Sequence, residues 1–110
     1  MTVQALAEKL NLECICEGDS GREVTGCYIG DLLSRVMGKA EQGNVWITIM
    51  SNVNVAAVAS IADVGCIILT EGVKPDNDLT AKLVMAEAAL YTTPMSSYEL
   101  AWKVHELIGA

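Results

Sequence analysis

Two short apolar runs, at residues 45–49 and 66–69, have the length of buried strands and end abruptly in small polar residues. Between them, residues 55–62 place apolar side chains at helical spacing. A strand, a helix and a second strand in this order predict two parallel strands joined by a right-handed crossover. Most other folds available to a short chain are disfavoured by this one pattern.

The rest of the chain continues the alternation of strands and helices. A helix after Thr2 precedes a short strand at 12–16, and an extended stretch at 23–29 leads into a helix that Asp31 would cap. A last strand at 90–92 is followed by a C-terminal helix. That helix opens with a capping box, in which Ser96 and Glu99 would each bond to the other's backbone. We predict an α/β fold, a small three-layer domain with a mainly parallel sheet and helices on both faces.

Composition fits one domain spanning residues 1–110. Hydrophobic residues make up 52% of the 110 residues, yet the chain has no Phe and only 5% aromatic residues. The core must therefore consist of branched aliphatic side chains, Ala and Met, which suit buried strands and close helix contacts.

Charge and cysteine content limit the partners and the compartment. The net charge of −7 opposes binding to nucleic acid and to anionic membrane surfaces. No stretch has the continuous apolar length of a membrane span, and the N-terminus lacks the pattern of a signal peptide. We expect a cytoplasmic protein whose four cysteines are free, mostly buried thiols.

Polar side chains gather where the predicted strands end. The carboxyl ends of parallel strands share one edge of an open α/β sheet, and ligands bind there. An alternative interpretation is that these residues only cap helices and form turns. The candidate ligand-binding residues at this edge are Ser51, Asn52, Asn54, Thr70, Glu71, Gly72, Thr92 and Thr93.

Arg22 is a further candidate, because it could recognise an anion, although a surface or loop-bracing role is the commoner one for such a residue. Cys14 and Cys16 would lie on one face of a strand, but a metal site would need two more ligands and the chain has a single His. No nucleophile elbow and no phosphate-binding glycine loop with Lys-Ser/Thr is present. We therefore expect no metal, no cofactor and no catalytic residues.

Three segments, at residues 21–33, 43–48 and 68–76, resemble the DRTGG domain family in order and spacing. The resemblance covers nearly the whole chain. It implies a fold similar to the N-terminal domain of HPr kinase/phosphorylase, whose kinase chemistry belongs to a separate domain. It also implies a regulatory or ligand-sensing role, since such domains occur in long phosphotransacetylases and beside CBS domains.

The chain departs from the family pattern at the edge that would bind a ligand. Ser51 and Asn52 stand where the pattern has Asp-Arg. Thr70 and Gly72 match its Thr-Gly-Gly, but Glu71 replaces the middle glycine. Losing an arginine and gaining a carboxylate makes the edge less suited to phosphate, so uncharged hydrogen-bonding groups are expected to hold any ligand.

The sequence leaves two classes of function open. The first is a non-catalytic regulatory module that senses a small metabolite or nucleotide at the carboxyl edge of the sheet, controls a partner enzyme, or does both. The second is a structural protein that dimerises or docks without a small ligand. The high mean hydropathy and Trp102 on the last helix favour a homodimer in either case.

Overall fold

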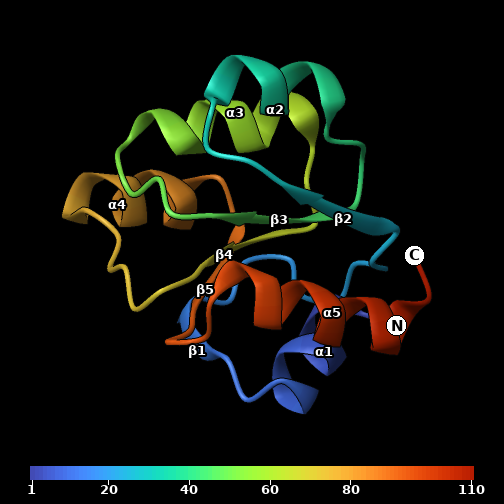
Figure 1. Cartoon of the computed structure of the whole chain (residues 1–110). Coiled ribbons are helices and arrows are strands. Elements are labelled where there is room, and N and C mark those ends of the chain that lie inside the picture. The colour runs from blue at the N-terminus through green and yellow to red at the C-terminus, as the bar shows by residue number, and fades with distance from the viewer.

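The computed structural model describes all 110 residues and contains five strands and five helices (Figure 1). The strands form one sheet in the order β1-β5-β4-β3-β2. The elements in chain order are α1 (Val3–Lys9), β1 (Glu13–Cys16), β2 (Gly26–Ile29), α2 (Leu33–Lys39), β3 (Asn44–Thr48), α3 (Asn54–Ala62), β4 (Cys66–Leu69), α4 (Asn77–Met85), β5 (Ala89–Thr92) and α5 (Ser97–Ile108).

The sheet is mainly parallel. Strands β2, β3, β4 and β5 run in the same direction, and only β1 pairs antiparallel, along the outer edge of β5. Each parallel pair is joined through one helix, as parallel strands require. The predicted mainly parallel sheet is therefore confirmed.

Helices cover both faces of the sheet, which makes three layers (Figure 1). On one face, α2, α3 and α4 pack against a cluster that includes Trp46, Ile67 and Leu90. On the other face, α1 and α5 pack against a cluster that includes Ile47 and Ile68. Strands β3, β4 and β5 are buried along their whole length, so function must reside at the strand ends or the sheet edges.

A β-bulge in β1 separates two cysteines that were expected to share a face. Cys14 lies opposite Tyr91 on β5, but Cys16 lies opposite Leu90, so the register shifts by one residue between them. Tyr91 and Leu90 belong to the clusters on opposite faces of the sheet. Cys16 is buried and Cys14 is exposed, so the prediction that they share a face is wrong.

Asp31 was predicted to cap a helix, but in the structure it joins two loops. Helix α2 begins without a side-chain cap. Asp31 Oδ1 instead accepts hydrogen bonds from Thr48 Oγ1 at 2.8 Å and from the Ile49 amide at 3.0 Å. The carboxylate thereby ties the end of β2 to the end of β3.

The cap of the last helix is half of the predicted capping box. Ser96 Oγ accepts from the Glu99 amide at 3.1 Å, as expected. The Glu99 side chain does not return to the cap but pairs with Lys103 one turn later, at 3.0 Å. Thr2 caps α1 through the Ala5 amide, as predicted.

The hydrogen bonds of Thr48 provide a test of the Asp31 contact. Thr48 is buried, donates to Asp31 and accepts from the Met50 amide. Thr48→Val keeps the shape but removes both bonds, so we expect the free energy of unfolding to fall by about 1–3 kcal/mol. Urea denaturation measures the change, with Thr80→Val on α4 as the control. An unchanged midpoint for Thr48→Val would contradict the role assigned to Asp31.

Candidate functional site

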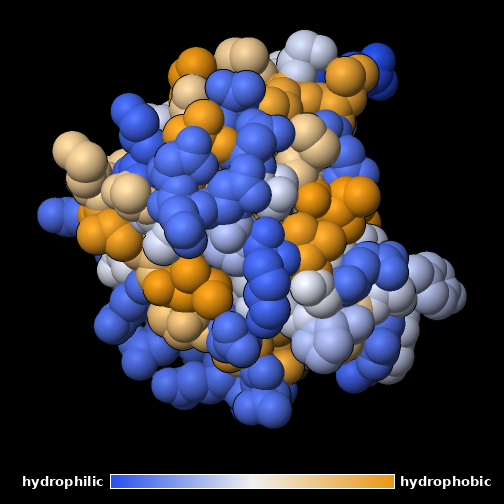
Figure 2. Space-filling view, turned by 90° about the vertical axis from the view of Figure 1, so that its left-hand side faces the viewer, coloured by the Kyte–Doolittle hydropathy of each residue, from blue (hydrophilic) through white to orange (hydrophobic).

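The carboxyl ends of the four parallel strands open onto one side of the molecule. This side lies at the left of Figure 1 and faces the viewer in Figure 2. Hydrophilic residues run across the middle of the face, with separate apolar patches beside them (Figure 2). The predicted ligand edge is therefore accessible rather than covered by a helix.

A polar pocket of about 400 Å³ lies at this edge, where β5 ends beside β1, and we call it the carboxyl-edge pocket. The ring of Pro94 is the one apolar side chain that lines it. Its volume lies within the range of small-molecule sites. The lining residues are Asn11, Glu13, Gly72, Lys74, Thr92, Thr93 and Pro94.

Backbone hydrogen bonds hold the two loops that form the pocket. The amide of Gly72, in the loop after β4, donates to the carbonyl of Thr93 at 3.1 Å. The neighbouring amide of Glu71 donates to the carbonyl of Met95 at 2.8 Å. These bonds fix the position of the β4–α4 loop against the β5–α5 loop, so the pocket is preformed.

Thr92 supplies a hydroxyl with no hydrogen-bond partner in the protein. The residue is only 3% exposed, but no buried side-chain polar atom of the protein lacks a partner, so the unbonded Thr92 hydroxyl is open to the pocket that it lines. Thr93 differs, since its Oγ1 accepts from the Met95 amide at 3.2 Å. This hydroxyl is therefore available to exchange a hydrogen bond with a ligand in the pocket.

The one cationic side chain of the pocket is loosely held. Lys74 Nζ lies 3.8 Å from Glu13 Oε2, and both side chains are mostly exposed. Such an exposed pair contributes little to stability, so Lys74 is free to contact a ligand instead.

Three of the candidate residues, Gly72, Thr92 and Thr93, line the carboxyl-edge pocket. Thr70 is buried beside it, but its Oγ1 lies 2.7 Å from Ser97 Oγ, which joins β4 to the start of α5. The Glu71 side chain is exposed at the same edge.

The candidates that follow β3 lie at the same side of the sheet but outside this pocket. Ser51 Oγ donates to Asp76 Oδ1 at 3.5 Å, and Asn52 Oδ1 accepts from the Asn54 amide at 2.9 Å. Asn54 lines a separate hollow between α3 and α4. The Asn52 bond shapes the turn before α3, whereas the Ser51 bond joins two loops, and α3 itself begins without a side-chain cap.

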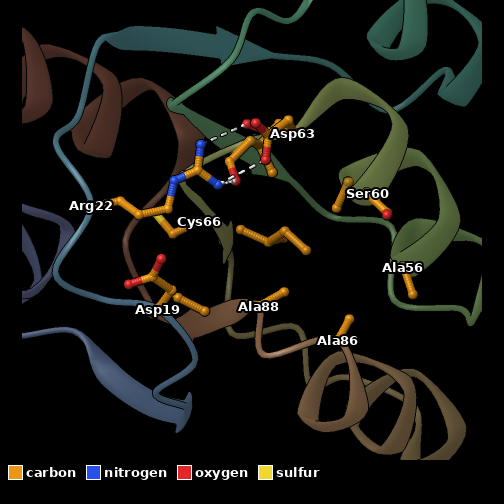
Figure 3. Close-up of a pocket in the computed structure, with 13 residues that line it drawn as sticks. Asp19, Arg22, Ala56, Ser60, Asp63, Cys66, Ala86 and Ala88 are labelled. Atoms are coloured by element: carbon orange, nitrogen blue, oxygen red, sulfur yellow. Dashed lines mark hydrogen bonds and ion pairs between the residues drawn. The ribbon is translucent and has the colours of Figure 1, made fainter.

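Arg22 lies at the opposite end of the sheet, where β4 and β5 begin (Figure 3). Its guanidinium donates to Asp63 Oδ1 at 2.9 Å and to the carbonyls of Val64 and Asp63 at 3.1 and 3.2 Å. Figure 3 shows Arg22 directed at Asp63, on the rim of a hollow of about 120 Å³. Arg22 thus braces the end of α3, and it does not join the other candidates.

Sequence reasoning missed the residues Asn11, Glu13, Lys74 and Pro94. Asn11 and Glu13 reach the pocket only because β1 pairs antiparallel with β5, which places the start of β1 beside the end of β5. Periodicity does not reveal that pairing. The sequence offered one hint at Asn11, because asparagine tolerates the left-handed backbone conformation better than most residues. Asn11 adopts that conformation here, with φ of 53°.

The cysteines are all free, and burial governs their acidity. Burial raises the pKa of Cys27 to about 11 and that of Cys66, where the neighbouring Cys27 adds to the effect, to about 12. These thiols are therefore protonated at neutral pH. No three His, Cys, Asp or Glu side chains come together in a group that could hold a metal ion. No helix has both the length and the apolar composition needed to span a bilayer.

Comparison with known proteins supports the fold. No protein-family model matches the chain, and no curated protein matches it. Among solved structures, it is similar to the CBS and DRTGG domains of the regulatory region of Clostridium perfringens pyrophosphatase, solved in complex with the activator diadenosine tetraphosphate. The TM-score is 0.73 at 14% sequence identity, over 94% of this chain and 45% of that one.

At this identity the likeness shows the fold alone, and it supports a DRTGG-like fold for this chain. The chain spans less than half the length of the pyrophosphatase regulatory region that it matches.

Glu71 provides a test of the edge geometry. It adopts a left-handed conformation, with φ of 62°, at the position where the family pattern has a glycine. A side chain is strained in that conformation, so Glu71→Gly should raise the free energy of unfolding by about 1 kcal/mol.

Glu41, which is exposed and lacks a positive φ, is the control. Glu41→Gly should lower stability, because glycine widens the unfolded ensemble. Equal effects in urea denaturation would contradict the strained backbone at Glu71.

Proposed function

We propose that this chain is a non-catalytic regulatory module that binds a small metabolite or nucleotide in the carboxyl-edge pocket and thereby controls a partner enzyme. The observation that carries the proposal is the unpartnered Thr92 hydroxyl in a preformed polar pocket at the ends of parallel strands. Open α/β sheets bind ligands at this place.

The charges around the pocket favour a ligand held mainly by uncharged hydrogen-bonding groups. Thr92, Thr93 and Asn11 offer hydroxyl and amide groups, whereas Lys74 is the one cation and Glu13 partly neutralises it. Exposed Glu71 and the net charge of −7 oppose a dense cluster of phosphates. A nucleoside or a ligand with a single phosphate fits this balance better than a polyphosphate.

The pocket residues support a binding role over catalysis. Its lining contains neither cysteine, serine nor histidine, and Thr93, one of its two hydroxyl groups, is engaged with a backbone amide. A threonine nucleophile needs an adjacent base, and no hydrogen bond links Thr92 to one.

A docking or dimerisation role without a small ligand is the second candidate. Three apolar side chains at the ends of β2 and β3 are exposed, with Ile29 at 49%, Leu32 at 64% and Ile49 at 44%. The Asp31 carboxylate ties the Ile49 amide to the segment that carries Leu32. Strand β2 is also an unpaired edge of the sheet, where a second copy could add its own strand.

Thermal unfolding with added ligands tests the proposal. The panel contains adenosine, AMP, ATP, diadenosine tetraphosphate, acetyl phosphate and common neutral metabolites. A ligand at one hundred times its dissociation constant adds about 2.7 kcal/mol of stability. We expect at least one compound to raise the melting temperature of the wild type and of Thr80→Val, and to have little effect on Thr92→Val.

Two outcomes would count against the proposal. A shift that survives in Thr92→Val places the ligand outside the carboxyl-edge pocket. No shift with any compound, together with a dimer mass in light scattering at micromolar concentration, favours the docking role.

A further inference from the structure

A second and larger hollow, of about 470 Å³, lies between α1 and the β1–β5 edge of the sheet, and we call it the α1 groove. Gln4, Glu8 and Asn11 line it from the side of α1. Glu17 and Ser20 line it from the segment after β1, and Tyr91 lines it from β5. It is separate from the carboxyl-edge pocket, although Asn11 lines both.

Two mostly buried residues, Ser20 and Tyr91, line the α1 groove with hydroxyls that have no hydrogen-bond partner in the protein. Ser20 is 5% exposed and Tyr91 is 3% exposed. Neither side chain makes a hydrogen bond within the protein, and neither hydroxyl is sealed from the groove. Two accessible hydroxyls that make no bond within the protein are thus available, on one hollow, to a ligand that enters it.

The charge of the α1 groove is negative. Glu8 and Glu17 contribute carboxylates, and no lysine, arginine or histidine is among the lining residues. The contact of Glu8 within the groove is weak, since Gln4 Nε2 donates to Glu8 Oε1 at 3.4 Å. Both carboxylates therefore keep most of their capacity to accept hydrogen bonds from a cation.

The Cys14 thiol and the Tyr91 phenol, which also line the groove, are neutral at physiological pH. Burial, with neighbouring Cys14 and other groups including Glu17, raises the pKa of Tyr91 to about 12. Burial and Glu17 also raise the pKa of Cys14. Each can therefore donate or accept a hydrogen bond, and the charge of the groove comes from Glu8 and Glu17.

We propose that the α1 groove binds a small organic cation through a primary ammonium group. The carboxylates of Glu8 and Glu17 neutralise the charge, and the hydroxyls of Ser20 and Tyr91 accept its remaining hydrogen bonds. An ammonium has three donors and no acceptor, which matches a site rich in acceptors. A bare metal ion fits less well, because no three metal-ligating side chains converge anywhere in the chain.

Calorimetric titration at low salt tests the proposal with putrescine as the probe. Its matched neutral control is 1,4-butanediol, which has the same length and hydroxyls in place of ammonium groups. We expect putrescine to bind the wild type and butanediol not to bind. The variants Glu17→Gln and Tyr91→Phe should each weaken putrescine binding about tenfold, because each removes a hydrogen bond to a charged group.

Glu41→Gln is the matched control variant, because it removes one exposed carboxylate that does not line the groove and changes the net charge equally. It should change the dissociation constant less than about twofold. Equal weakening by Glu41→Gln and Glu17→Gln would show general attraction to an acidic protein and overturn the proposal. Absence of putrescine binding at about 10 mM would also overturn the proposal, because a dissociation constant above that concentration is too weak to indicate a site.

Discussion

The complete burial of β3, β4 and β5 determines where this molecule can act. Helices cover both faces of these strands, and apolar side chains fill the space between the layers. No functional group can therefore be presented from the middle of the sheet. Parallel pairing then brings the polar residues after each strand to one side of the molecule, and the short antiparallel strand β1 closes the sheet beside β5. Both hollows described above lie along that β1–β5 border.

The two hollows differ in chemistry although they adjoin at Asn11. The carboxyl-edge pocket contains Lys74 and a free Thr92 hydroxyl, and its mixed character suits a largely uncharged ligand. The α1 groove contains two carboxylates and no cation. The two hollows therefore favour ligands of different charge, a largely uncharged one and a cation.

Local patterns were sufficient to predict the three layers, the mainly parallel sheet and the caps at Thr2 and Ser96. They also predicted that Gly72, Thr92 and Thr93 lie at the carboxyl edge of the sheet, because the end of a strand can be recognised from the sequence. Contacts between segments that are distant in the chain could not be predicted from the sequence. Asp31 precedes a helix, as a capping residue would. Its carboxylate instead accepts hydrogen bonds from the end of β3, which lies beside it in the fold. The bulge between Cys14 and Cys16, and the approach of Glu13 to Lys74, depend on the pairing of β1 with β5 across most of the chain.

The central claim is that the carboxyl-edge pocket holds a small ligand. The most direct test is an amide NMR spectrum of the labelled chain, recorded with and without a metabolite extract filtered to remove macromolecules. The account predicts that the shifted signals cluster on Gly72, Lys74, Thr92 and Thr93. Shifts confined to Ile29, Leu32 and Ile49, or an unchanged spectrum, would contradict it.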